Sequence, residues 1–399
     1  MASNTDWSKI RDEFDAMPGV VYLNTGTCGR TPTPVQRVAA DWRQRLAAEP
    51  CEILWRRLPE ALWLARERLA KFVNALPESI TFMANVTAGV NTITSGLRLE
   101  PGRDVIVNEQ EYGAMIFAWE RAAARAGAGV RTIELPAGPE VAKQDLLDRF
   151  DAALDRNAQL LFLSHISTAT GLVFPVREIC ELASARGVLT VIDGAHAPGM
   201  IAVDLRAIGC DFYTANGHKW LLAPCGSGFL YIRPGMEDRV EPLVASWGLK
   251  YDRAVAHQRD RDGSTPHIRS HEFQGTRDPA PWLAMPAAID FHEQIGLEPI
   301  RRRDRELADC ARRLFASLPG VTPALPDDAS LRAALASYRL PRGDATQIQR
   351  QLWEKYRIET PVLARPTGPH VRVSTHFYNT EEEIDRLHAA LAELLPNIV

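Results

Sequence analysis

The sequence predicts an α/β protein in which helices cover both faces of a mostly parallel sheet. Three short apolar runs, at residues 160–163, 188–192 and 229–232, have the length of strands and contain β-branched or aromatic residues. Nearly continuous apolar runs of this kind suit strands that are buried on both faces. A helical pattern at residues 177–187 joins the first two runs, which makes a βαβ unit.

The other elements follow from periodicity and turn signals in chain order. Further strands are expected at residues 20–23, 80–83, 104–108, 130–135, 336–340 and 371–374. Further helices are expected at residues 35–46, 62–73, 144–154, 281–296, 299–318, 345–356 and 381–395. The polar stretch 247–268, with its charge run RDRDG, is expected to be a surface or lid loop.

Composition and charge limit the class of protein. The 399 residues carry 46 Lys and Arg against 50 Asp and Glu, a formal charge of −4, so we expect no affinity for nucleic acid or for an anionic membrane. No apolar run approaches the roughly 20 residues of a membrane span, and the first residues do not resemble a signal peptide. The 6 cysteines show no CxxC spacing, so we expect no metal site and a reducing, cytoplasmic location.

Polar residues follow the central strands at the point where each strand ends. Open α/β sheets bind ligands outside these carboxyl ends. Asp193 follows an apolar strand and needs a cationic partner, whereas Lys219 precedes the apolar run WLL, which favours a lowered pKa and a nucleophilic amine. One interpretation is a structural salt bridge between the two residues. The other is a cofactor between them, since pyridoxal phosphate requires a lysine for its aldehyde and an acid for its pyridine nitrogen.

A possible anion site precedes the central unit. Residues 80–91 read as a strand, a polar turn and the start of a helix, where free N–H groups and the helix dipole point in the same direction. Thr87 lies in this turn, and its alternative role is that of a simple helix cap.

Six motifs in this order resemble the class V aminotransferase family, whose members are fold type I pyridoxal phosphate enzymes. They are YLNTGTCG, MANVTAGVN, VIDGAHAPG, TANGHKWLLAPCGSGFLYI, FQGTRD and VRVSTHFYNTEEEIDRL. The resemblance implies a large cofactor domain with a mostly parallel seven-stranded sheet and a smaller α+β C-terminal domain. We place an N-terminal arm at residues 1–19, the large domain at 20–280 and the small domain at 281–399.

The resemblance also implies a role for each candidate residue. Lys219 would bind the cofactor and move the substrate proton, and Asp193 would bind the pyridine nitrogen. Tyr112 would stack on the ring. The phenolic oxygen would be contacted by His196 and Thr168, and the phosphate by Val86, Thr87, Asn216 and His218.

Three further expectations concern the substrate and the assembly. Arg372 would grip the α-carboxylate with its planar guanidinium, and the loop with Asn24 and Thr25 would border the substrate. Thr276 would reach the phosphate of the other subunit. The resemblance therefore implies a homodimer with shared active sites.

Members of this family catalyse several different reactions with the same cofactor. The motifs therefore predict the cofactor but do not identify the reaction. The leading prediction is epimerisation at Cα of an amino acid, or of the amino-acid end of a larger metabolite, in secondary metabolism. C–S lysis of a cysteine conjugate, and decarboxylation or deamination, remain open. A cysteine desulfurase needs a nucleophilic cysteine shortly before Arg372, and residues 358–372 contain none. A non-enzymatic scaffold is not expected because Lys219, Asp193 and Arg372 are all present.

Overall fold

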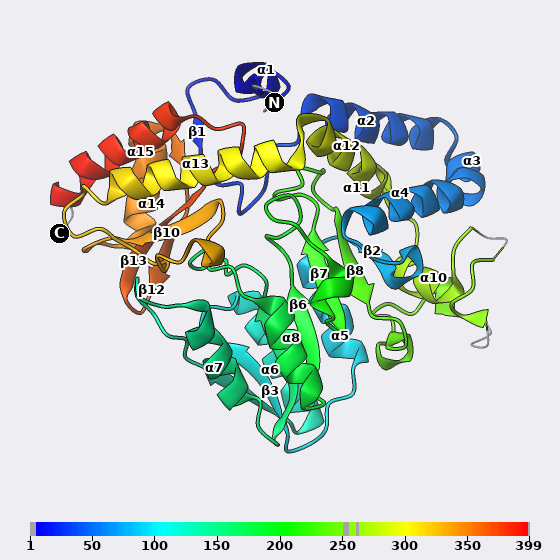
Figure 1. Cartoon of the computed structure of the whole chain (residues 1–399). Coiled ribbons are helices and arrows are strands. Elements are labelled where there is room, and N and C mark those ends of the chain that lie inside the picture. Colours follow the sequence, from blue (N-terminus) through cyan, green and yellow to red (C-terminus); the bar gives the residue numbers. More distant parts are fainter. Residues whose placement is uncertain (1–4, 250–254, 261–262, 398–399) are drawn as a thin grey trace.

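A seven-stranded sheet forms the centre of the computed structural model, which describes residues 5–249, 255–260 and 263–397 (Figure 1). The strand order is β2-β8-β7-β6-β5-β3-β4. The strands are β2 (Ile80–Met83), β3 (Asp104–Asn108), β4 (Gly129–Ile133), β5 (Ala158–Ser164), β6 (Leu189–Asp193), β7 (Phe212–Asn216) and β8 (Gly228–Ile232). The pairs from β4 to β7 are parallel, and β8 is antiparallel to both its neighbours. The expected mostly parallel sheet is confirmed.

Helices cover both faces of this sheet, as the continuous apolar strands require. The helices α5 (Val86–Gly96), α6 (Gly113–Ala126), α7 (Lys143–Ala153) and α8 (Val176–Ala185) connect successive strands. Side chains alternate across β6: Val191 packs into one apolar cluster and Ile192 into the other. Every residue of β5, β7 and β8 is buried. Ser164, Asp193 and Asn216 are the last residues of β5, β6 and β7, where polar side chains can face a ligand.

A second, antiparallel sheet lies in the C-terminal part of the chain. Its order is β12-β13-β10-β9. The elements are α13 (Leu297–Phe315), β9 (Thr322–Pro323), β10 (Leu335–Arg339), α14 (Ala345–Tyr356), β11 (Ile358–Glu359), β12 (Val362–Arg365), β13 (Gly368–Ser374) and α15 (Glu381–Leu394). The strand β13 carries Arg372 toward the central sheet, so this part of the chain supplies one wall of the site.

The start of the chain joins this C-terminal part. The strand β1 (Val21–Tyr22) pairs in parallel with β11, although the expected large domain begins at residue 20. The helix α1 (Trp7–Arg11) lies in the expected arm, with the ring of Trp7 6.1 Å from that of Phe377. Residues 1–4 lie outside the described residues. The division into two domains stays a prediction.

Three helical expectations needed correction at their boundaries. The helix expected at 281–296 is two helices, α11 (Ala280–Leu283) and α12 (Met285–Ile295), with Pro286 in the first turn of the second. A proline lacks the N–H that would continue the first helix and clashes with the preceding turn. The helices expected at 35–46 and 62–73 are longer, α2 (Thr33–Ala48) and α4 (Leu58–Phe72).

The expected loop at 247–268 is described only in part. The structure shows η4 (Trp247–Leu249) and the start of α10 (Pro266–Glu272), while residues 250–254 and 261–262 lie outside the described ranges. Its role as a lid stays a prediction. Within the described residues, no helix is both long and apolar enough to cross a membrane.

Candidate active site

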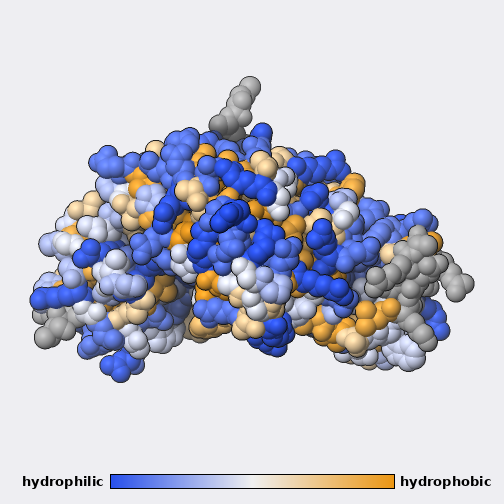
Figure 2. All heavy atoms as spheres, turned by 90° about the horizontal axis from the view of Figure 1, so that it is seen from below, coloured by the Kyte–Doolittle hydropathy of each residue, from blue (hydrophilic) through white to orange (hydrophobic). Residues whose placement is uncertain are grey.

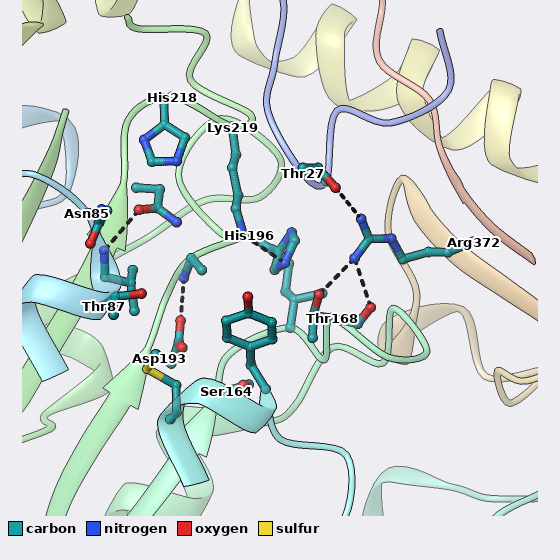
Figure 3. Close-up of a pocket in the computed structure, with 17 residues that line it drawn as sticks. Thr27, Asn85, Thr87, Ser164, Thr168, Asp193, His196, His218, Lys219 and Arg372 are labelled. Atoms are coloured by element: carbon teal, nitrogen blue, oxygen red, sulfur yellow. Dashed lines mark hydrogen bonds between the residues drawn. The ribbon is translucent and has the colours of Figure 1, made fainter. Parts of the chain in front are cut away.

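A cavity of about 240 Å³ opens at the carboxyl ends of β5, β6 and β7 (Figure 3). The start of α5, the loop after β1 and the strand β13 complete its walls. Most of the predicted site residues line it, namely Val86, Thr87, Tyr112, Thr168, Asp193, His196, Asn216, His218, Lys219 and Arg372. Residues that are far apart in the sequence thus meet at the edge of the sheet where ligands of such folds bind.

Lys219 and Asp193 share this cavity without forming an ion pair. The described residues show no contact within 4.0 Å between their charged atoms, so the interpretation as a structural salt bridge is wrong. Nζ of Lys219 lies 3.3 Å from Nε2 of His196 instead. Burial lowers the pKa of Lys219 to about 8, although the charge of Asp193 raises it. The amine is therefore poised as a nucleophile near neutral pH.

Backbone geometry at two glycines fixes these two side chains. Gly194 follows Asp193, and a Cβ there would lie 2.2 Å from the ring of Tyr213. The turn lets the N–H of Ala195 donate to Oδ1 of Asp193 at 2.8 Å, which leaves the other oxygen for a ligand. Gly29 donates its N–H to the carbonyl of His218 at 2.8 Å, so close to the lysine loop that a Cβ would lie 2.0 Å from the carbonyl oxygen of Lys219.

Burial controls the charge of Asp193. It raises the pKa of the carboxyl to about 6, while the hydrogen bond from Ala195 and the charge of Lys219 lower it. A cationic group in the cavity, such as a protonated pyridine nitrogen, would stabilise the carboxylate.

The start of α5 forms the anion-binding end of the cavity. Asn85 caps the helix by accepting from the N–H of Ala88 at 2.9 Å, and Oδ1 of Asn216 accepts from the N–H of Val86 at 3.0 Å. The N–H of Thr87 has no partner within the helix because it lies in the first turn. This N–H and the amide nitrogen of Asn216 are therefore suited to a phosphate.

His218 borders the same end of the cavity. Its Nδ1 lies 3.2 Å from the carbonyl oxygen of Ser227, which can only accept, so Nδ1 carries the proton. Nε2 can then donate to a phosphate only when the ring is positively charged. Burial lowers the pKa of His218, so a bound anion would have to stabilise that charge.

Arg372 is a buried cation with neutral neighbours. Its Nη1 donates to Oγ1 of Thr168 at 2.8 Å, and its Nη2 donates to Oγ1 of Thr27 at 3.0 Å and to Oδ1 of Asn24 at 3.2 Å. The residue is 5% exposed, and no described carboxylate pairs with it. Burial lowers its pKa to about 10. A buried charge without a counter-ion is costly, so the site is suited to an anionic ligand.

In the loop after β1, the threonine that faces the cavity is not the one that the sequence analysis predicted. Oγ1 of Thr25 lies 2.5 Å from the hydroxyl of Tyr378, and this pair is buried away from the lining residues. Thr27 lines the cavity instead. Asn24 stays behind the lining and acts through Arg372. A short polar turn offered no pattern that separates Thr25 from Thr27.

Thr276 lies outside this cavity. It is exposed beside a second cavity of about 460 Å³ between α4, α10 and the turn at 275–277. Trp55 and Phe273 line the same second cavity. Thr276 therefore does not reach the first cavity of its own chain.

Glu111 was missed as a part of the site. Its carboxyl accepts from the backbone N–H of Ser164 at 3.0 Å, from the hydroxyl of Ser164 at 2.5 Å, and from the side chain of Asn108. Burial raises the pKa of Glu111 to about 8, and the charge of Asp193 raises it further. Only the three-dimensional fold reveals this support, because 53 residues separate Glu111 from Ser164.

The cavity suits pyridoxal phosphate in each of its parts. It offers a nucleophilic amine, a carboxylate with one oxygen available, a free helix N-terminus and a buried guanidinium without a counter-ion. These are the groups that the cofactor's aldehyde, pyridine nitrogen and phosphate, and a substrate carboxylate, require.

Comparison with known proteins identifies the family. The class-V aminotransferase profile matches residues 54–387. The chain belongs to the class-V aminotransferase family. It is 45% identical over 392 residues to an isopenicillin N epimerase from Streptomyces clavuligerus, covering 98% of each chain, and 44% identical over 395 residues to one from Amycolatopsis lactamdurans, covering 98% of this chain and 99% of the relative. A probable cysteine desulfurase from Methanothermobacter thermautotrophicus is 29% identical, covering 96% of this chain and 97% of the relative.

Solved structures confirm the fold. The K223A mutant of C-DES, with glycine covalently linked to its pyridoxal phosphate cofactor, matches with a TM-score of 0.82 at 25% identity and covers 96% of this chain and 99% of that one. The protein is thus a pyridoxal phosphate-dependent enzyme of the fold type I class, as expected, and the cysteine desulfurases are distant relatives.

Proposed function

We propose that the enzyme inverts the configuration at Cα of its amino-acid substrate, as an isopenicillin N epimerase. The observation that carries the proposal is the 44–45% identity to two such enzymes over at least 98% of every chain compared. The matched regions span the whole chain and therefore cover the part that holds the site, whereas the desulfurase relatives reach only 29% identity. When bound, pyridoxal phosphate supplies an electron sink for the negative charge that develops at Cα.

Lys219 is the proposed cofactor anchor and proton carrier. Its lowered pKa favours the neutral amine that an aldehyde requires. With the substrate held in the site through its amino group, the amine of Lys219 would be a positioned base for the Cα proton. A solvent-derived proton delivered to the opposite face would invert the configuration at Cα.

Arg372 and Asp193 hold the reacting groups in place. The guanidinium of Arg372 would bind the substrate α-carboxylate and prevent rotation about Cα, which selects the bond to be broken. Asp193 would keep a proton on the pyridine nitrogen. Thr87 and Asn216 would fix the phosphate at the other end, and Tyr112 would cover the ring.

We further propose a homodimer in which Thr276 completes the partner's site. This proposal is supported by the position of Thr276, which is exposed in the FQGTRD motif and lies away from the cavity of its own chain. Large apolar side chains are also exposed, including Trp247 at 83% and Trp55 at 62%, which lines the second cavity together with Thr276. Figure 2 shows a mainly hydrophilic face on which hydrophobic residues gather at the lower right edge. Such exposed apolar area is typical of an interface.

The cysteines support a reducing, cytoplasmic location, which stays a prediction. All six are free thiols, including Cys28 and Cys225, whose sulfur atoms lie 3.3 Å apart. That separation exceeds the roughly 2.05 Å of a disulfide bond.

Chiral chromatography tests the proposed reaction. The enzyme is incubated with isopenicillin N, and separately with the product, and the two diastereomers are resolved over time. The proposal expects both reactions to reach the same mixture of diastereomers without loss of total substrate. Conversion of either compound to a keto acid and ammonia would contradict it.

C–S lysis is the second candidate, because one fold neighbour is a cystine C–S lyase. That structure, a complex with cysteine persulfide, has a TM-score of 0.82 at 24% identity and supports the fold alone. The same Lys219 could remove the Cα proton before a β-sulfur leaves. Release of a thiol or persulfide together with a keto acid from a cysteine conjugate would favour this candidate over epimerisation.

A further inference from the structure

Trp220, the residue after Lys219, contacts the site through His196. Its indole Nε1 lies 3.2 Å from Nδ1 of His196, and both side chains are buried. The other ring nitrogen of His196, Nε2, lies 3.3 Å from Nζ of Lys219. His196 is thus held between the indole and the amine, and Figure 3 shows its ring beside the tip of Lys219.

The chemistry of these groups assigns the protons. An indole N–H can only donate, and a neutral imidazole has one donor and one acceptor nitrogen. Nδ1 of His196 must therefore accept from Trp220, which places the imidazole proton on Nε2. The opposite tautomer would put two N–H groups against each other in a buried site, where an unmade hydrogen bond is costly.

We propose that Trp220 is a positioning residue that holds His196 in its Nε2–H tautomer, so that this N–H points into the cavity. There it faces the amine of Lys219, and it would donate to the phenolic oxygen of the bound cofactor. The inference rests on the proposed cofactor contact of His196, but not on which reaction follows.

Trp220 is itself anchored from the C-terminal part of the chain. Its carbonyl oxygen lies 2.9 Å from Nε2 of His376 and 3.1 Å from Nε2 of His292. Nδ1 of His376 lies 3.1 Å from the carboxyl of Asp304, on α13. These contacts restrict the backbone of Trp220, and close packing restricts its indole, so the donor stays aimed at His196.

The tautomer has a consequence for Lys219. An Nε2–H group can bond only to an acceptor, and the amine is an acceptor only when it is neutral. The same hydrogen bond therefore favours the uncharged, nucleophilic form of Lys219. Burial keeps the pKa of the His196 imidazole well below its usual value, so the ring is neutral at working pH.

Replacement of the indole N–H in the holoenzyme tests the proposal. Trp220→Phe keeps an aromatic ring and removes the donor. With ¹⁵N-labelled histidine, long-range ¹H–¹⁵N spectra identify the tautomer of His196, whose signal is assigned by its absence from His196→Gln. We expect a single Nε2–H tautomer in the native enzyme and a mixture in Trp220→Phe. The absorption maximum of the bound cofactor should shift, and kcat should fall about tenfold with little change in KM, the factor expected for one hydrogen bond.

Trp119→Phe is the matched control. Trp119 is as buried as Trp220, but its Nε1 has no hydrogen-bond partner among the residues that the structure describes. The variant therefore loses packing and no described hydrogen bond. It should retain the native tautomer and the native absorption maximum. A shift of equal size in this control would mean that loosened packing, and not the indole donor, controls His196.

Two results would overturn the proposal: an Nδ1–H tautomer in the native enzyme, or an unchanged tautomer in Trp220→Phe. If Trp220→Phe fails to fold, benzothienylalanine at position 220 replaces the N–H by sulfur in a ring of nearly the same shape and gives the same comparison. The tautomer is measured without substrate. The role of Trp220 can therefore be confirmed even if the protein is not an epimerase. Failure of the proposed reaction and failure of the proposed role of Trp220 are thus distinguishable.

Discussion

Nη1 of Arg372 donates to Oγ1 of Thr168 at 2.8 Å, but no described carboxylate neutralises this buried guanidinium. All its acceptors are neutral groups from two loops. The arrangement orients the planar group and leaves its charge for a ligand, as a carboxylate site requires.

Arg372→Lys should lower kcat/KM by about 10- to 100-fold, because a lysine cannot form two parallel charge-assisted hydrogen bonds that contribute about 1.5–3 kcal/mol each. Steady-state kinetics measure the effect. The substrate's α-amide lacks the carboxylate and serves as control, since it should be processed equally slowly by both enzymes. If Arg372→Lys lowered kcat/KM equally for the acid and the amide, Arg372 would not act through the substrate α-carboxylate.

The lowered pKa of Lys219 should be visible in the cofactor-free enzyme. With a pKa of about 8 in place of 10.5, about half of this amine is uncharged at pH 8, compared with about 0.3% of an ordinary lysine. Reductive methylation across pH 6–11, read by mass spectrometry of the peptide with residue 219, should give a midpoint near the lower value. A midpoint near 10.5 would contradict the effect of burial.

Asp193→Ala should fold and bind cofactor, but slow Cα–H exchange by about 10²-fold or more, the effect of losing one electrostatic group at a reacting centre. The fold should survive because the variant loses one hydrogen bond, to Ala195. Circular dichroism checks the fold and solvent exchange checks the chemistry. Native exchange in this variant would exclude an electronic role for Asp193.

A hybrid dimer should reveal whether Thr276 acts across subunits. One chain carries Lys219→Ala and the other carries Thr276→Asp, which sets a carboxylate against the phosphate. If Thr276 serves the partner, the chain with Lys219 receives an intact Thr276, and the hybrid keeps about half the activity of the native dimer. Each parent homodimer should be inactive. An inactive hybrid would show that Thr276 acts within its own chain, and an active monomer at dilution would exclude the shared site.

Strand-end patterns predicted much of the sheet and of the cavity. Asp193 and Lys219 follow apolar strands, and parallel strands bring such ends to one edge, so their meeting could be expected. The break near Ala284 could not be placed, because Pro286 is compatible with the first turn of a helix as well as with its interruption. A residue pattern marks an element more reliably than its ends.

Contacts between segments that are distant in the chain could not be predicted from the sequence. Trp220 and His196 are 24 residues apart, and Trp220 reads locally as one more apolar residue. Its hydrogen bond depends on how the lysine loop packs beside the end of β6. Thr25 and Thr27 likewise differ only in the direction that the folded turn gives them. Side-chain direction in irregular segments is set by tertiary packing.

Deuterium incorporation at Cα tests the central claim most directly. The native enzyme is incubated with isopenicillin N in D₂O, and the diastereomers are separated and analysed by mass spectrometry and NMR. Removal of the Cα proton and delivery of a solvent-derived deuteron to the opposite face predict an inverted product with deuterium at Cα and an intact carboxylate. Lys219→Ala should give no such product. Inversion in the native enzyme without deuterium at Cα under rapid solvent exchange, or release of CO₂ with the Cα proton retained, would contradict the account.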